Sequence, residues 1–231
     1  MLASVPTVVF LFLGAACAAI AASGRGPWWA FAWPAACFAV VAAGYAGLGP
    51  RILGKRADGQ RAFAARVLMA PYLLLALATW NIIRFLRRGR PPTRALFDDV
   101  VIGRRLTRDE PAPFASVLDL SAELDEPAHC RALPGYRCHP WLDGTAPSGA
   151  EIVRVVDEIE ALPRPLFIHC AEGYGRAAVV ACALVAARSL ASDVDGAVAY
   201  VRARRRGIWL RRPQRKSVAD AIALLVARRR A

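Results

Sequence analysis

Two long runs of apolar residues dominate the first fifty positions. Residues 5–22 form an eighteen-residue run and residues 28–48 a twenty-one-residue run, and neither contains a charged side chain. A helix rises about 1.5 Å per residue and the hydrocarbon core of a bilayer is about 30 Å thick, so each run is long enough to cross a membrane. Because only residues 23–27 separate them, the pattern predicts a helical hairpin of two spans. The first four residues carry no basic side chain, so a cleaved signal peptide is not expected.

A third apolar run, residues 67–83, is ambiguous. It has seventeen residues, contains Pro71 and has basic clusters on both sides. If it crossed the membrane, one cluster would lie on the side that the positive-inside rule disfavours. Two spans followed by an interfacial or re-entrant helix are therefore the preferred topology, and three spans are the alternative. In both we expect a multi-pass protein of the inner membrane whose remaining part is cytoplasmic. The basic clusters are Arg61 and Arg66 before the run, and Arg84, Arg87, Arg88 and Arg90 after it.

The pattern changes after residue 90, where Pro91 and Pro92 stop any helix. We expect a membrane region over residues 1–90 and a second domain over residues 91–231. In the second domain, Ser148 and Glu151 form a capping box, and apolar positions at helical spacing continue to Leu162. Strands alternating with helices predict an α/β fold with a central, mainly parallel sheet flanked by helices, preceded by an α-helical transmembrane region. The predicted strands are 100–102, 116–120 and 165–169, and further helices are predicted over 176–190, 193–204 and 213–228.

The net charge of +13 is unevenly distributed. The part up to Arg90 has ten basic and one acidic side chain, whereas the rest has twenty-one basic and seventeen acidic ones. Arginines beside long apolar runs are explained by anionic lipid headgroups, so we expect a lipid membrane as partner and no nucleic acid.

The six cysteines do not suggest a metal site. They include no C-x-x-C pair, and the three histidines are not clustered, so we expect no metal and no cofactor. Cys130 and Cys138 would be able to form a disulfide in an exported domain, but two thiols in a reducing compartment are the simpler interpretation.

The stretch from His169 to Arg176 combines several features of an anion site. The predicted strand ends at Cys170 and the next helix starts near Ala177, so the residues between form a strand-to-helix turn, where α/β sheets bind ligands. Glycines allow the backbone to turn its N–H groups inward, and the helix N-terminus adds partial positive charge. The sequence therefore predicts a phosphate-binding loop made by His169, Ala171, Glu172, Gly173, Tyr174 and Gly175 together with Cys170 and Arg176.

Within this loop, Cys170 is the candidate nucleophile. Arg176 offers a planar fork of donors for two phosphate oxygens, and with the amides and the helix dipole it favours the thiolate. His169 is expected to orient the loop. The plain alternative is a buried strand-end thiol followed by an ordinary helix-start arginine, but the coincidence of His-Cys, two glycines and an arginine six positions later favours a site.

Cleavage of a phosphate ester also needs a proton donor for the leaving oxygen. Asp143 is the preferred candidate, because it stands in the turn-rich loop 142–147 between a short strand and the capped helix. Its alternative is an aspartate that simply favours a turn. Asp119, at the end of a β-run, is better explained as a structural residue. The other upstream candidates are Glu123, Asp125 and Glu126.

The loop matches the His-Cys-x5-Arg motif of the protein tyrosine phosphatase superfamily, and residues 96–225 resemble its dual-specificity branch. Segments 98–104 and 117–120 are similar to its first strands, and 139–143 to the segment that bears its general acid. The resemblance implies a cysteine-dependent phosphoric monoester hydrolase with a phosphocysteine intermediate, in which Arg176 binds phosphate and Asp143 acts as acid and then as base. Gln214 resembles a residue near the hydrolytic water, with a surface glutamine before a helix as its alternative.

Two features qualify this resemblance. The family usually has Ser or Thr after the loop arginine, where this chain has Ala177, so hydrolysis of the intermediate is expected to be slower. Glu172 and Tyr174 replace the lysines of members that act on polyphosphorylated inositols, so a monoester on a phosphorylated protein or a phospholipid is the expected substrate. The alternatives are a catalytically weak phosphate-binding module at the membrane and a sulfur-transfer domain, which has no need of Asp143.

Overall fold

The computed structural model describes residues 4–24 and 26–230 and divides into two compact units. One unit comprises the chain up to Arg56 together with residues 60–87 and 122–125; the other comprises residues 57–59, 88–121 and those from 126 onward. The first three residues, which enter the signal-peptide argument, and Arg25 of the hairpin connection lie outside the described residues.

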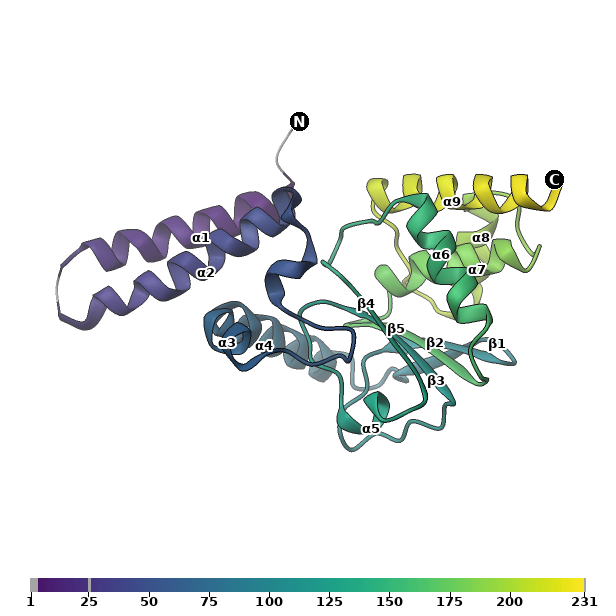
Figure 1. The fold of residues 1–231 in the computed structure, drawn as a ribbon, viewed down its shortest axis with the longest axis horizontal. Helices are drawn as coiled ribbons and strands as arrows, with labels where there is room; N and C mark the ends of the chain where they lie inside the picture. Colours follow the sequence, from purple (N-terminus) through teal and green to yellow (C-terminus); the bar gives the residue numbers. More distant parts are fainter. Residues whose placement is uncertain (1–3, 25, 231) are drawn as a thin grey trace. The chain divides into compact units, whose positions relative to one another are not determined.

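The first unit begins with the predicted helical hairpin (Figure 1). Helix α1, Val5–Ala22, starts at Ser4, whose hydroxyl accepts a hydrogen bond from the Thr7 amide at 3.3 Å. Its partner runs from Gly26 to Leu48 as η1 (Gly26–Phe31), α2 (Ala32–Ala43) and η2 (Gly44–Leu48). Both stretches are long and apolar enough to cross a membrane, although length and composition alone are weak evidence for one.

The outward side chains of α1 are also apolar. Large apolar groups cover its surface, and Phe12 is 73% exposed. An apolar surface of this kind is rarely left to water in a soluble protein.

The third apolar run is not one helix. A short helix η3, Pro50–Leu53, precedes it, and the run itself is divided at Met69 into α3, Phe63–Leu68, and α4, Ala70–Leu86. Pro71 lies in the first turn of α4, where its missing N–H removes no helical hydrogen bond. With seventeen residues α4 is about 26 Å long, shorter than the two stretches of the hairpin.

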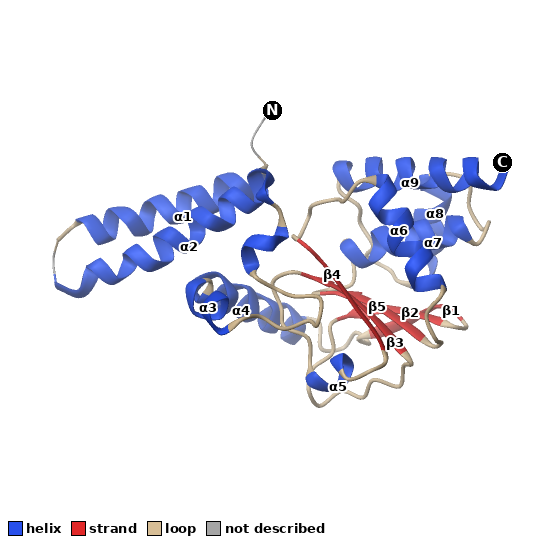
Figure 2. Ribbon diagram, in the orientation of Figure 1, coloured by secondary structure: helices blue, strands red, loops and turns tan. Residues whose placement is uncertain are grey.

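The second unit is built on a five-stranded sheet in the order β1-β2-β5-β3-β4 (Figure 2). Only β1 is antiparallel to its neighbour, so the predicted mainly parallel sheet is confirmed. The sequence did not predict β1, because its residues show no run of branched side chains and follow two prolines. The strands are β1 (Thr93–Phe97), β2 (Val100–Arg104), β3 (Ser116–Ser121), β4 (Gly135–Trp141) and β5 (Leu166–Cys170).

Helices cover both faces of this sheet. Four of them, α6 to α9, lie on one face, and the single-turn α5 lies on the other (Figure 1). Helix α7 is the central one: all its residues from Arg176 to Ala186 are buried, and its small Ala and Val side chains fit between the sheet and its neighbours. The helices are α5 (Ala128–Arg131), α6 (Gly149–Glu160), α7 (Arg176–Ala187), α8 (Val194–Arg204) and α9 (Arg212–Arg230), which confirms the four long ones predicted.

The parallel strands bring the candidate residues to one edge of the sheet. In the register of the sheet, Cys170 lies beside Arg104 of β2, and His169 lies beside Asp119 of β3. β4 ends at Trp141, two residues before Asp143. Since the carboxyl ends of parallel strands meet at one edge, Cys170 and Asp143 come from separate segments to the same region.

Candidate active site

The loop from Cys170 to Arg176 is held in a shape that only glycine allows at one position. Gly173 has φ +72°, and a Cβ there would lie 2.1 Å from the carbonyl oxygen of Gly103. In this conformation the Gly173 amide donates to Cys170 Sγ at 3.2 Å. An amide aimed at the sulfur stabilises negative charge on it, as a nucleophilic thiolate requires.

The N-terminus of α7 supplies further donors. Gly175 is the residue before the helix, and within the described chain no side chain caps this end and no acidic residue lies in the first turn. The N–H groups and the positive end of the helix dipole are therefore available to an anion in the loop.

Arg176 is fixed from the ends of two other strands. Its side chain is 1% exposed, and Nη1 donates to the Trp141 carbonyl at 2.8 Å and to the Leu120 carbonyl at 3.5 Å. Nη2 lies 3.3 Å from Asp143 Oδ1. The structure thus places Asp143 against Arg176, the residue that ends the loop that begins at Cys170.

Asp143 lies on an ordered turn, with 62% of its side chain exposed. Thr145 Oγ1 donates to the Leu142 carbonyl at 2.8 Å and closes the turn. Gly144, with φ +71°, faces Arg211. The exposed carboxyl can therefore reach solvent and a bound ester alike.

Gln214 is buried, which excludes the interpretation as a surface glutamine. It is 1% exposed, and its Nε2 donates to the Thr145 carbonyl at 3.1 Å while its Oε1 accepts from the Arg211 amide at 3.0 Å. Nε2 is also 3.7 Å from the position that a Cβ on Gly175 would take. Gln214 therefore lies between the Asp143 turn and the phosphate-binding loop.

Arg205 is a residue of this site that the sequence did not identify. It donates from Nε to the Gly173 carbonyl at 2.9 Å and from Nη2 to the Glu172 carbonyl at 3.0 Å, and its guanidinium lies 4.6 Å from the Tyr174 ring centre. Burial lowers its pKa. By holding these carbonyls outward, Arg205 keeps the loop amides turned inward. The run Arg204-Arg205-Arg206 indicated only a basic helix end, with no signal to single out the central member.

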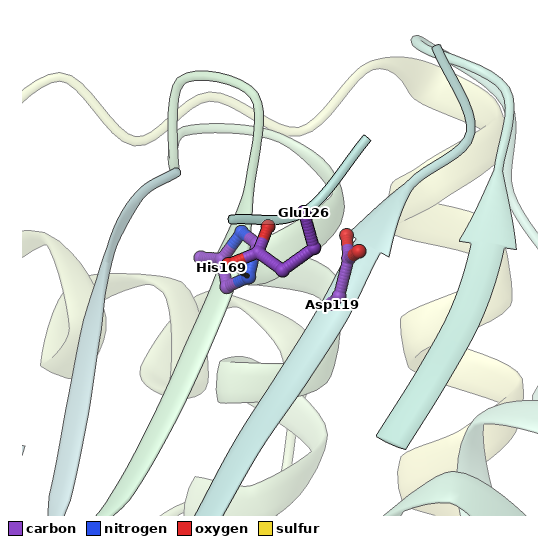
Figure 3. A group of neighbouring side chains, drawn as sticks. All are labelled: Asp119, Glu126 and His169. Carbon is purple, nitrogen blue, oxygen red and sulfur yellow. Dashed lines mark ion pairs between the residues drawn. The ribbon is translucent and has the colours of Figure 1, made fainter. Parts of the chain in front are cut away.

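His169, the residue before Cys170, belongs to a buried cluster with Glu126 and Asp119 (Figure 3). Its Nε2 lies 3.4 Å from Glu126 Oε1, and Glu126 Oε2 lies 3.7 Å from Arg105 Nε. The ring stacks on Phe167 with centroids 5.0 Å apart. Glu126 thus contacts His169 and Arg105 within this cluster, and the role of His169 in orienting the loop stays a prediction.

Asp119 completes the cluster, and by donor type Asp119, Glu126 and His169 could hold a metal, since their ligand atoms lie within 4.8 Å of one another. However, Asp119 Oδ1 accepts from the Ser121 amide and hydroxyl, both at 2.9 Å, and Oδ2 accepts from the Tyr136 hydroxyl at 3.0 Å. Burial raises the pKa of Tyr136, so that hydroxyl stays a donor. These bonds fit the structural role expected for Asp119.

Two of the remaining candidates, Glu123 and Asp125, belong to the first unit. Asp125 pairs with Arg61 and Arg66 of its own unit, and Glu123 is buried. Ala171 and Tyr174 are half-buried in the loop itself. All six cysteines are thiols; burial raises the pKa of Cys182 to about 12 and raises that of Cys130 as well, which makes both poor nucleophiles.

Comparison with known proteins agrees with this geometry. A family model described as protein-tyrosine phosphatase matches residues 105–223. No curated protein matches the sequence.

Three solved structures are similar in fold. Tk-PTP in its active form is 23% identical with a TM-score of 0.51, over 58% of this chain and 97% of that one. PTPMT1 in complex with PI(5)P is 16% identical with a TM-score of 0.50, over 60% and 99%. A mouse chain described as a dual specificity phosphatase, complexed with zinc tungstate, is 16% identical with a TM-score of 0.49, over 61% and 92%.

Proposed function

Because the chain belongs to the protein-tyrosine phosphatase family, we propose that it hydrolyses phosphate monoesters through a phosphocysteine intermediate on Cys170. The observation that carries this proposal is the loop itself. Cys170 Sγ accepts a hydrogen bond from the Gly173 amide. At the other end of the loop, Nη2 of Arg176 lies 3.3 Å from the carboxyl of Asp143, which comes from a separate segment.

In the first step the Cys170 thiolate attacks phosphorus and the ester P–O bond breaks. The Arg176 fork and the loop amides hold the non-bridging oxygens, and protonated Asp143 gives its proton to the leaving oxygen. In the second step water attacks the phosphocysteine, Asp143 takes a proton from that water, the S–P bond breaks, and inorganic phosphate leaves.

The ion pair between Arg176 and Asp143 suggests how binding of the substrate frees the Asp143 carboxyl to act as the acid. A phosphate bound in the loop competes with Asp143 for Nη2, because both are anions that need the same donor. Binding of the ester therefore releases the carboxyl towards the leaving oxygen. We assign to Gln214, which donates to the Thr145 carbonyl in the Asp143 turn, the role of holding the attacking water.

We further propose that the helical hairpin anchors the enzyme in the inner membrane. The two apolar stretches of the hairpin would be its spans, and α4 an interfacial helix. Residues 91–231 would then form a cytoplasmic catalytic domain. Attachment favours substrates at the membrane, either phosphorylated proteins or phospholipids; the lipid option gains support from the fold shared with PTPMT1, whose structure holds PI(5)P.

The test uses the full-length chain in detergent with an aryl phosphate and EDTA. We expect hydrolysis that Cys170→Ser abolishes and that the matched thiol variant Cys138→Ser preserves. If phosphate binds but no Cys170-dependent hydrolysis occurs, the chain is instead a phosphate-binding module, an alternative that Ala177 favours.

A further inference from the structure

A second basic pocket adjoins the catalytic loop. Its volume is about 660 Å³, and five arginines and Tyr174 contribute to its walls, with no acidic residue among its lining. The walls come from four segments: the linker with Arg90, strand β1 with Arg94, the catalytic loop with Tyr174, and the end of α8 with the residues after it, which carry Arg204, Arg205 and Arg206. All of them belong to the second unit.

Three of the five arginines of this pocket have no carboxylate beside them in the described part of the chain. Arg90, Arg94 and Arg206 are exposed, and in residues 4–24 and 26–230 no carboxylate pairs with any of them. A run of arginines is usually a solvated surface, but here residues distant in sequence converge on one concavity. Like charges confined in this way repel one another, and a bound anion relieves that repulsion.

Two of the arginines are held rigidly. Arg204 lies 3.5 Å above the Tyr200 ring and donates to the Tyr200 carbonyl at 3.2 Å. Arg205 is bonded to the loop carbonyls of Glu172 and Gly173. A wall that is already ordered binds an anion with little further loss of side-chain entropy.

The pocket and the catalytic loop share residues. Tyr174 lies between the two loop glycines and also lines the pocket, and Arg205 contacts both. A substrate whose scissile phosphate occupies the loop therefore has a second positively charged site directly beside it.

We propose that this pocket binds a second phosphate group of the substrate, next to the monoester that is cleaved. The substrate class is a polyol ester with two phosphates. The inference rests on the proposed function, and it changes one expectation: Glu172 opposes extra negative charge within the loop, but the second charge would lie outside it, among the arginines.

The test measures binding to full-length Cys170→Ser protein in detergent, so that turnover is not needed. The probes are myo-inositol 1-phosphate and myo-inositol 1,4-bisphosphate, and the variants are Arg94→Gln and Arg206→Gln, with Arg108→Gln as the matched exposed control. We expect the bisphosphate to bind at least tenfold more tightly, each pocket variant to remove about tenfold of that difference, and the control to change nothing. Equal affinity for both probes, or equal loss with all three variants, would overturn the proposal.

A second arm distinguishes a phosphate of the substrate from the headgroup of a neighbouring lipid. The same titration is repeated in phosphatidylcholine vesicles with and without phosphatidylglycerol. Unchanged discrimination supports the substrate's own phosphate; discrimination lost only with phosphatidylglycerol assigns the pocket to lipid and overturns the proposal. Failure of the proposed function is seen separately, as absent hydrolysis of aryl phosphate by the unmodified chain.

Discussion

At the scale of single residues, the site depends on which atoms face which. Cys170 faces an amide, Arg176 faces backbone carbonyls and Asp143, and His169 faces Glu126. The first contact lies within the loop, with the Gly173 amide, and the others join the loop to separate segments, so the chemistry depends on the fold as a whole. The roles of these side chains are best separated by changes that leave the backbone intact.

Asp143→Asn tests the proton donor. A general acid must carry its proton when the leaving oxygen departs, so kcat/KM of the unmodified enzyme, which reports the first step, should fall as pH rises. In the variant kcat/KM should be about a hundredfold or more lower and should no longer fall with pH. The measurement is kcat/KM against pH with an aryl phosphate, with Asp220→Asn as an exposed control; an unchanged profile would remove Asp143 from the mechanism and reopen the sulfur-transfer alternative.

Ala177→Ser tests the second step. Ala177 is fully buried in the first turn of α7, and a hydroxyl there adds a donor for the departing thiolate. The unmodified enzyme should release a burst of aryl alcohol before a slower steady state. The variant should show a smaller burst and a higher kcat in stopped-flow traces, whereas a burst of unaltered size would show that the thiolate needs no hydroxyl at this position.

At the scale of elements, the strands and helices around the site could mostly be predicted from the sequence, whereas Arg205 and strand β1 could not. Ser148 caps α6 as expected, accepting from the Glu151 amide at 3.2 Å, but the Glu151 carboxyl accepts from Trp141 Nε1 instead of closing the capping box. Helix caps and amphipathic helices involve residues that are close in sequence, so these features could be predicted.

The features that were harder to predict depend on contacts between distant segments. Arg205 bonds to carbonyls thirty-two and thirty-three positions away, so no local pattern marks it. Gln214, whose carbonyl partner is sixty-nine positions away, was singled out only by the family resemblance. Strand β1 is likewise defined by its pairing with β2 rather than by its own residues.

Two glycines of the loop offer a matched pair of variants. In Gly173→Ala the new Cβ would overlap the Gly103 carbonyl at a positive φ, whereas in Gly175→Ala it would meet only Gln214 Nε2 at an ordinary 3.7 Å. Gly173→Ala should therefore lose nearly all activity and phosphate binding, and Gly175→Ala much less. Both are compared by kcat/KM and by melting temperature. Equal activity in the two variants would contradict this account of the loop.

The turn between β1 and β2 is tied to the end of α7 by an ion pair. Arg188 donates to Asp99 at 2.7 and 2.8 Å, and these bonds hold the pKa of Asp99 below its ordinary value. A lowered pKa means that the stabilisation is complete above the unfolded value of about 4 and is lost as pH falls through the folded value. Asp99→Asn should thus destabilise the protein by about 1 kcal/mol at pH 7, and by less at pH 3.

Thermal unfolding at both pH values measures this, with Asp195→Asn as an exposed control. An equal effect at pH 7 and pH 3 would show that the ionised carboxyl is not what stabilises the turn.

At the scale of the whole molecule, the chain combines an apolar helical hairpin with a phosphatase domain, two units of opposite surface character. The outward side chains of α1 are apolar, whereas the walls of the pocket beside the catalytic loop are rich in arginine. The proposed membrane anchor would account for the first feature, and the proposed second phosphate of the substrate for the second.

Phe12→Arg tests the anchor. A charge near the centre of a membrane span costs about 2.5–3.5 kcal/mol, so the variant should be extracted more readily than the unmodified chain by alkaline carbonate. Phe12→Leu, which keeps the apolar surface, should stay in the membrane pellet. Complete extraction of the unmodified chain would exclude a spanning hairpin.

The proposed mechanism depends on the covalent intermediate at Cys170, which rapid acid quenching can trap. The full-length Asp143→Asn variant, which should still accept phosphate from a reactive aryl ester, is mixed with substrate, quenched within milliseconds, digested and analysed by mass spectrometry. The account predicts one phosphoryl group on the peptide that contains Cys170, and none in Cys170→Ser. Hydrolysis without a phosphorylated Cys170, or with the label on another residue, would contradict it.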